Sequence, residues 1–141
     1  MLAAMTTSGA GGARVEPAPR STYTLGVQAV AVSPELRATL AEYRRLLDGI
    51  FGVRLCSVRL FGSRARGDAD VESDADVCVV VDGLTEGERN IAVDLAHDAW
   101  RRTGCRSPFV SPLVWSTSEL EACRRRQRRI ALDIDREGIA L

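Results

Sequence analysis

The spacing of hydrophobic positions changes along the chain, and each spacing predicts a different element. Between Ser33 and Gly52, large apolar side chains recur every three or four residues, which is the period of a helix with one buried face. Ser33 can cap the start of this helix, and Gly52 suits its end. Residues 53–61 and 74–81 are instead rich in β-branched and large apolar residues, so they predict two strands.

The second half of the chain predicts further helices around one more strand. Residues 85–103 carry apolar positions at helical spacing. Residues 108–115 predict a third strand, and we expect it at a sheet edge or a bulge because Pro112 cannot donate a ladder hydrogen bond. Residues 116–138 predict two helical pieces, with 139–141 packed at the end. The order of elements predicts an α/β (α+β) fold, a small mixed β-sheet flanked by helices.

The N-terminal part of the chain differs from the rest in composition. Residues 1–22 are rich in Gly, Ala, Ser, Thr and Pro and show no hydrophobic period, so we predict a disordered N-terminal tail. Residues 23–32 are mildly apolar and predict no particular element. A chain of 141 residues fits one compact domain, which we place at residues 33–141.

Charge and composition exclude some classes of function. The 19 basic and 19 acidic residues cancel, which argues against broad, charge-driven binding to nucleic acid while leaving room for a local basic site. All the basic residues are Arg, so no lysine can serve as a nucleophile or a phosphate clamp. No stretch approaches the roughly 20 apolar residues of a membrane span. We see no secretory signal and expect a cytoplasmic protein without membrane contact.

The four cysteines do not form a metal or redox motif. None lies within four residues of another, which excludes a zinc knuckle or a CxxC pair. Cys56 and Cys78 fall in apolar, strand-like stretches. We therefore predict that both are buried, reduced side chains that pack as small hydrophobic groups.

Candidate chemistry begins at Gly62 and Ser63, where a predicted strand gives way to a helix. Glycine at this junction lets the backbone approach a ligand closely, and the amides that follow favour an anion. The Ser63 hydroxyl can bond a phosphate oxygen, and Arg64 and Arg66 can neutralise phosphates. Taken alone, this pair is better explained as an ordinary strand-to-helix turn with two surface arginines.

A pair of aspartates opens the next predicted strand. Asp74 and Asp76 are two residues apart, so both carboxylates project to the same side of the strand. Two carboxylates held this close repel each other unless a cation lies between them. Oxygen ligands of this kind suit Mg²⁺ or Mn²⁺. An acidic loop whose carboxylates are merely solvated is the alternative.

The combination is more specific than either part. Ten residues separate Ser63 from Asp74, and adjacent strands would bring a phosphate-binding turn to the metal ligands. With these four positions, the GSRARG and SDAD segments and the closing Arg136-Glu137-Gly138-Ile139, the chain resembles the DNA polymerase β-type nucleotidyltransferase superfamily. It most closely resembles the minimal nucleotidyltransferases, which are often encoded beside a HEPN-domain toxin. The resemblance runs from about residue 33 to residue 141.

This resemblance implies transfer of AMP, or another NMP, from ATP or another nucleoside triphosphate to a hydroxyl acceptor. Gly62 and Ser63 would bind the triphosphate, and Asp74 and Asp76 would hold one or two Mg²⁺ ions. A partner protein of the HEPN toxin type would carry the acceptor hydroxyl. Two alternatives stay open, namely a non-catalytic, antitoxin-like binding protein and a nucleotidyltransferase that modifies a small molecule.

The chain departs from the family pattern at the third carboxylate that active members carry on a later strand. The natural place is within residues 108–115, which contain no acid, and Ser111-Pro112 stands about where we expect it. Asp82 lies six residues beyond Asp76, about 20 Å along the strand, and is too far away. The remaining acids that stay open as substitutes are Asp68, Asp70, Glu72, Asp133 and Asp135.

Overall fold

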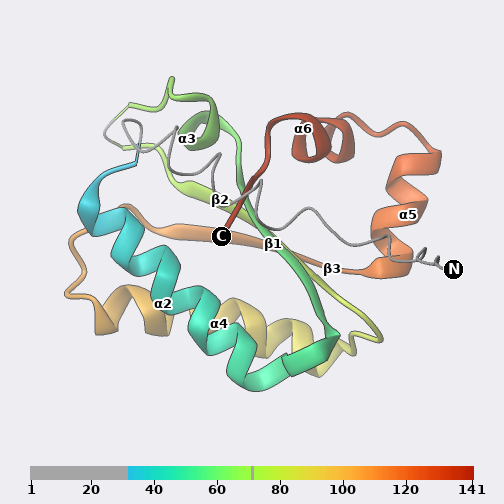
Figure 1. Ribbon diagram of the computed structural model, residues 1–141, viewed down its shortest axis with the longest axis horizontal. Helices are drawn as coiled ribbons and strands as arrows, with labels where there is room; N and C mark the ends of the chain where they lie inside the picture. Colours follow the sequence, from blue (N-terminus) through green and yellow to red (C-terminus); the bar gives the residue numbers. More distant parts are fainter. Residues whose placement is uncertain (1–31, 71) are drawn as a thin grey trace, which may run out of the picture.

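The computed structural model describes residues 32–70 and 72–141 (Figure 1). The predicted tail at 1–22 and most of the segment 23–32 lie outside these residues. Within the described ranges the chain forms a four-stranded sheet with helices on both of its faces. The expected mixed sheet flanked by helices is therefore confirmed.

The elements follow the predicted order. The helices are α2 (Pro34–Phe51), the 3₁₀ turn η3 (Gly52–Arg54), α3 (Ser63–Arg66), α4 (Glu86–Arg102), α5 (Thr117–Arg125) and α6 (Arg129–Glu137). The strands are β1 (Leu55–Phe61), β2 (Ala75–Val81), β3 (Val110–Ser116) and β4 (Ile139–Ala140). Among the described residues, no helix has the length and apolar character needed to cross a bilayer.

The sheet has the strand order β3-β2-β1-β4. β1 pairs antiparallel with both β2 and β4, whereas β2 pairs parallel with β3. We expected the strand with Pro112 at a sheet edge or a bulge, and the edge position is confirmed for the described residues, where β3 ends the strand order and pairs with β2. The last residues pack at the end as expected, and they do so as the short strand β4.

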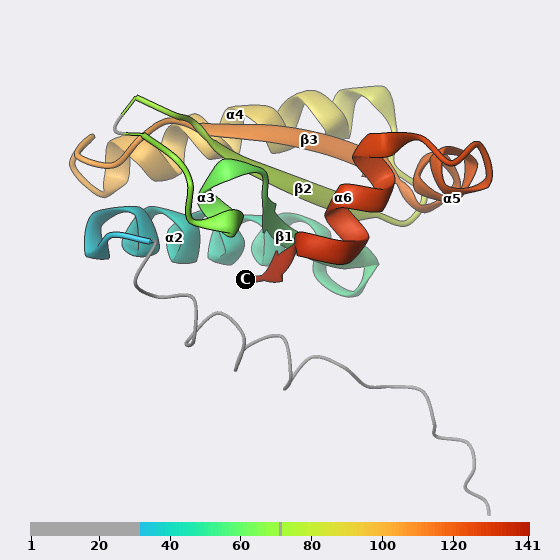
Figure 2. The ribbon, with the colours of Figure 1, turned by 90° about the horizontal axis from the view of Figure 1, so that it is seen from above.

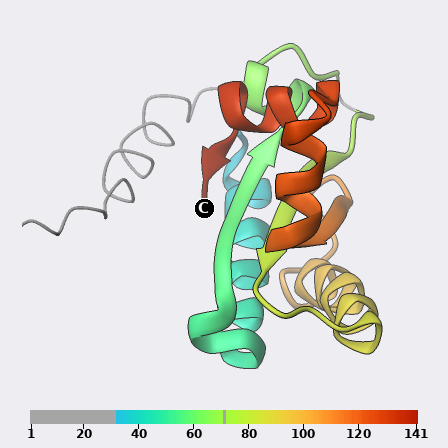
Figure 3. The same cartoon turned by 90° about the vertical axis from the view of Figure 1, so that its right-hand side faces the viewer.

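The helices lie in two groups on opposite faces of the sheet. α2 and α4 pack against each other on one face, with α4 beside β3 and α2 beside β1 (Figure 2). α5 and α6 cover part of the other face (Figure 3). Val77, Val79 and Val81 of β2 are fully buried against α2 and α4, while Cys78 and Val80 pack against α5 and α6. This alternation sends Asp76 to the α5–α6 face.

Helix starts follow the capping chemistry of the sequence. The hydroxyl of Ser33 accepts a hydrogen bond from the amide of Leu36 at 3.1 Å, which caps α2 as predicted. Thr85 and Ser116 each form a full capping box at the start of α4 and α5. These local hydrogen bonds define where the helices α2, α4 and α5 begin.

Of the two cysteines predicted to be buried, one is buried and the other is exposed. Cys78 is buried between the sheet and α6, as expected. Cys56 is exposed, because the β1–β2 register shifts between Leu55 and Ser57 and leaves Cys56 at a bulge without a cross-strand partner. The prediction rested on the apolar, strand-like stretch around Cys56, which does not reveal a bulge.

Replacing Gly138 by alanine is expected to destabilise the fold by about 1–3 kcal/mol. An added Cβ would overlap the carbonyl oxygen of Ile134 and stand 3.0 Å from Cδ of Arg59. Gly49→Ala is the matched control, because a Cβ at Gly49 meets nothing within 4 Å and should stabilise α2 by about 0.5–1 kcal/mol. Urea unfolding of the two variants and wild type measures both changes. Equal stabilities of the two variants would contradict the packing described for Gly138.

Candidate functional site

The C-terminal end of β1 and the N-terminal start of β2 lie side by side at one end of the two central strands of the sheet. Antiparallel pairing puts Phe61, the last residue of β1, directly opposite Asp76. The chain then turns at Gly62 into α3, which follows β1 directly (Figure 1). This turn passes beside the Asp76 carboxylate. The structure therefore brings together the two parts of the predicted site that are far apart in sequence.

Gly62 is in contact with the carboxylate of Asp76. A Cβ built on Gly62 would stand 2.6 Å from Oδ2 of Asp76, closer than real side chains approach. Gly62 also has a φ of 76°, in the region that side chains other than glycine rarely adopt. Any other residue here would strain the backbone and displace the carboxylate.

Ser63 opens the short helix α3 directly after this turn. The carbonyl of Gly62 accepts hydrogen bonds from the amides of Ala65 and Arg66 at 3.1 and 3.0 Å, which closes the turn. Ser63 is partly exposed, and among the described residues its hydroxyl has no hydrogen-bond partner. The hydroxyl is therefore available to a ligand at the same edge as the aspartates.

Asp74 and Asp76 form a pair of carboxylates without counter-ions in the described part of the chain. Asp74 is exposed just before β2, and Asp76 is half-buried as the second residue of β2. Burial raises the pKa of Asp76 above its ordinary value, and the charge of Asp74 raises it further, while Arg66 opposes the shift. Hard oxygen donors that repel each other in this way fit a divalent cation.

The third carboxylate has no equivalent on β3. Ser111 lies beside Asp76 in the parallel pairing of β2 with β3. The residue at the place where we expected a third carboxylate is therefore an exposed serine. Other acids near the site are engaged by arginines, since Asp68 and Glu137 pair with Arg66 at 3.2 Å each. Across residues 32–70 and 72–141, no group of three metal-ligating side chains occurs.

All but one of the acids left open on the last helix and in the loop are engaged as well. Asp135 pairs with Arg124 at 2.6 Å, and Asp133 lies 3.6 Å from Arg129. Asp70 accepts hydrogen bonds inside its own loop. Glu72 is exposed and its side chain has no ion pair within the described residues, but it forms no group of three metal-ligating side chains with Asp74 and Asp76. The structure thus completes no three-carboxylate site around Asp74 and Asp76.

Both arginines predicted to bind phosphate are engaged by the protein itself. Arg64 donates to the carbonyl oxygens of Asp70 and Ser73, and Arg66 forms the two ion pairs named above. Their phosphate-binding roles stay predictions, and a phosphate would have to compete with these hydrogen bonds and ion pairs for the two guanidinium groups. The Arg64 contacts could not be predicted from the sequence, because they depend on the path of the loop between α3 and β2.

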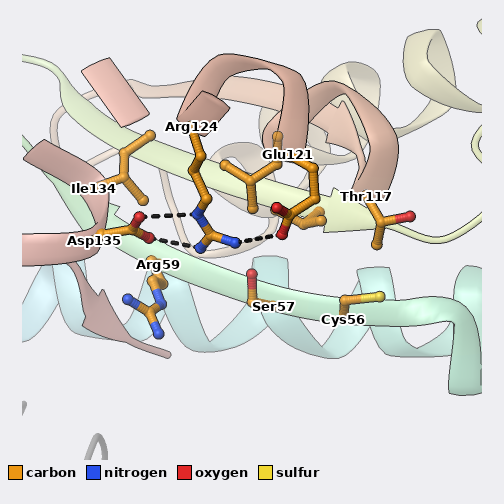
Figure 4. Close-up of a pocket in the computed structure, with 10 residues that line it drawn as sticks. Cys56, Ser57, Arg59, Thr117, Glu121, Arg124, Ile134 and Asp135 are labelled. Atoms are coloured by element: carbon orange, nitrogen blue, oxygen red, sulfur yellow. Dashed lines mark hydrogen bonds and ion pairs between the residues drawn. The ribbon is translucent and has the colours of Figure 1, made fainter. Parts of the chain in front are cut away.

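A separate cavity of about 250 Å³ lies on the same sheet face, between β1, α5 and α6 (Figure 4). Val80 lines it, four residues beyond Asp76 and so about 13 Å along the strand. At its rim, Arg124 bonds Asp135 through two nitrogens and Glu121 through a third. The cavity is thus distinct from the carboxylate pair.

Comparison with known proteins bears on the same residues. Residues 40–107, just under half of the chain, match the family model described as nucleotidyltransferase domain. The match contains the Gly62 turn and both aspartates and ends before Ser111. A solved structure from Sulfolobus solfataricus, provisionally assigned as a nucleotidyltransferase, is 23% identical over 79% of this chain and 85% of that chain, with a TM-score of 0.36. No curated protein matches the chain. The nucleotidyltransferase resemblance is confirmed over the matched residues.

Replacing Asp76 by asparagine is expected to raise the melting temperature of the metal-free protein near neutral pH. The folded pKa of Asp76 lies above its ordinary value of 3.8, so ionisation is disfavoured in the folded state. The neutral carboxyl contributes to the stability of the folded state. This contribution is fully present below the ordinary pKa of 3.8 and is lost as pH rises through the higher pKa of the folded state. The advantage of the variant should therefore shrink toward acid pH, which thermal melts in a chelator measure.

Asp94→Asn is the control for this measurement. Asp94 is exposed on α4 and has no ion pair or hydrogen bond from its side chain within the described residues. Its replacement should change stability by no more than about 0.5 kcal/mol. An Asp76→Asn protein that melts below wild type at neutral pH would show that the carboxylate is stabilised by a partner.

Proposed function

We propose that this protein transfers a nucleoside monophosphate from a nucleoside triphosphate to a hydroxyl acceptor, with a divalent cation held by Asp74 and Asp76. One observation carries the proposal: the contact between the Gly62 turn and the carboxylate of Asp76, beside a second carboxylate that has no counter-ion in the described residues. The family match over residues 40–107 supports the reaction class.

Each residue of the site has a part in this reaction. Gly62 leaves room for the Asp76 carboxylate against the backbone, so that the turn would present its main chain to phosphate oxygens, and the Ser63 hydroxyl would donate to one of them. Asp74 and Asp76 accept the cation, Mg²⁺ with ATP or another triphosphate, through their oxygens. When bound, such an ion would neutralise phosphate charge and orient the reacting oxygens. The half-buried position of Asp76 limits its access to water.

The acceptor belongs to the proposal as well. We retain a hydroxyl on a partner protein, of the HEPN toxin type that the sequence resemblance implies, as the first acceptor to test. The described residues form one small domain, and Asp74 is exposed at the start of β2. This arrangement is compatible with a large acceptor. Cytoplasmic location is part of the same proposal.

A second candidate is a nucleotide-binding protein without catalysis. Ser111 favours it, because this serine occupies the position beside Asp76 where a third carboxylate would complete the site. Loss of a general base typically lowers a rate by about 10²–10⁴-fold. Two carboxylates still suffice to bind a metal–triphosphate complex.

The proposal predicts Mg²⁺-dependent transfer of label from α-labelled ATP to a protein in a lysate of the source cell. The reaction is run with wild type and with an Asp74→Asn/Asp76→Asn protein, and ATP binding is measured on the same samples. Wild type should fix label and bind ATP, and the double variant should do neither. Label fixed equally by both proteins would contradict the assignment of the two aspartates.

Ser111→Asp distinguishes the two candidates. Ser111 is exposed on an edge strand, so an aspartate fits there without a change of core packing. If wild type binds ATP but transfers slowly, the added carboxylate should raise transfer by about 10²-fold or more. If wild type and Ser111→Asp both bind ATP and neither transfers label, the non-catalytic candidate replaces the enzyme.

A further inference from the structure

Asp74 stands outside the regular ladder, so other contacts must fix its position. It precedes Ala75, the first residue of β2. The peptide group after Asp74 is tied to the residue just before β3, because the amide of Ala75 donates to the carbonyl of Phe109 at 2.9 Å. The orientation of the peptide group before Asp74 then decides where its carboxylate points relative to Asp76.

Arg64 holds that preceding peptide group. Nε and Nη2 of Arg64 donate to the carbonyl oxygen of Ser73 at 3.2 and 2.8 Å. This carbonyl belongs to the same peptide plane as the amide of Asp74. A planar guanidinium that bonds one oxygen through two N–H groups restrains that plane more firmly than a single bond does. Both peptide groups that flank Asp74 are therefore fixed.

The same guanidinium ties together the ends of the turn that leads to Asp74. Nη2 of Arg64 also donates to the carbonyl of Asp70 at 3.0 Å. Asp70 and Ser73 are already linked, because the Ser73 hydroxyl donates to Asp70 Oδ1 at 3.0 Å and the Ser73 amide lies 3.2 Å from the Asp70 carbonyl. Arg64 thus anchors a preformed turn to α3, directly behind the Gly62 turn.

We propose that Arg64 is a positioning residue for the cation site, which acts on Asp74 through the Ser73 carbonyl rather than by binding phosphate itself. This inference rests on the proposed function. It replaces the sequence-based role of Arg64 as a phosphate ligand by a structural role in the same site. Arg66 differs, because its guanidinium reaches carboxylates on α6 and in the loop and leaves the main chain next to Asp74 untouched.

The sign of the effect separates positioning from simple charge. Removing a positive charge close to two carboxylates strengthens the binding of a cation by Coulomb attraction. Removing a residue that holds a ligand in place weakens it, typically by about 10–100-fold for the groups that orient metal ligands. A loss of cation affinity after removal of Arg64 is therefore a geometric effect.

The test measures the affinity of Mn²⁺ alone by electron paramagnetic resonance, and the affinity of tripolyphosphate separately by calorimetry. The proteins are wild type, Arg64→Ala, Arg64→Lys and, as matched control, Arg66→Ala, each with its melting temperature. We expect both Arg64 variants to bind Mn²⁺ about 10-fold more weakly than wild type or worse. Arg66→Ala should bind Mn²⁺ as wild type does or more tightly.

Arg64→Lys makes the test decisive. It keeps the charge and most of the stem but lacks the planar fork, and it carries the comparison if Arg64→Ala melts far below wild type. The proposal is overturned if the Arg64 variants keep wild-type Mn²⁺ affinity, or if only tripolyphosphate binding falls in Arg64→Ala and lysine restores it. If wild type binds neither Mn²⁺ nor tripolyphosphate, the proposed function itself fails, and this inference fails with it.

Discussion

The close approach of Gly62 to the carboxylate of Asp76 is the constraint on which the candidate site depends. Antiparallel pairing of β1 and β2 places Phe61 opposite Asp76, so the residue after β1 must pass beside that carboxylate. Only glycine leaves the space, since a Cβ would lie 2.6 Å from Oδ2. Glycine at this position therefore follows from packing as well as from its positive φ. Ser63 follows Gly62 directly, and Arg64 of the same short helix anchors the loop that leads to Asp74. The position of both therefore depends on the Gly62–Asp76 contact.

The same arrangement disfavours the ionised form of Asp76. Asp76 is half-buried between the sheet and the turn, its pKa is raised by burial and by Asp74, and it has no ion pair or hydrogen bond in the described residues. The strand beneath it offsets this, because Val77 and Val79 are fully buried against the two helices of the other face. A carboxylate whose charge has no ion pair within the described residues is available to a cation, which is a common compromise between stability and function.

Local chemistry made much of this site predictable from the sequence, and long-range geometry explains what was not. The meeting of the Gly62 turn with Asp76 could be predicted because a strand end, a turn glycine and a two-residue spacing each have a direct structural meaning, whereas the roles of these residues stay predictions. The contacts of Arg64 could not, because a side chain that bonds main-chain carbonyls depends on the path of a loop. The exposure of Cys56 required knowledge of a bulge. The last strand has only two residues, too few for an alternating pattern to show.

The central claim is that a divalent cation binds between the Gly62 turn and the two aspartates. Paramagnetic broadening of backbone amide signals by Mn²⁺, recorded with and without tripolyphosphate, tests it most directly. The strongest broadening should lie at residues 62–63 and 74–76, and tripolyphosphate should extend it into α3. Broadening centred on the cavity rim at Glu121 and Asp135, or spread evenly over exposed acids, would contradict the account.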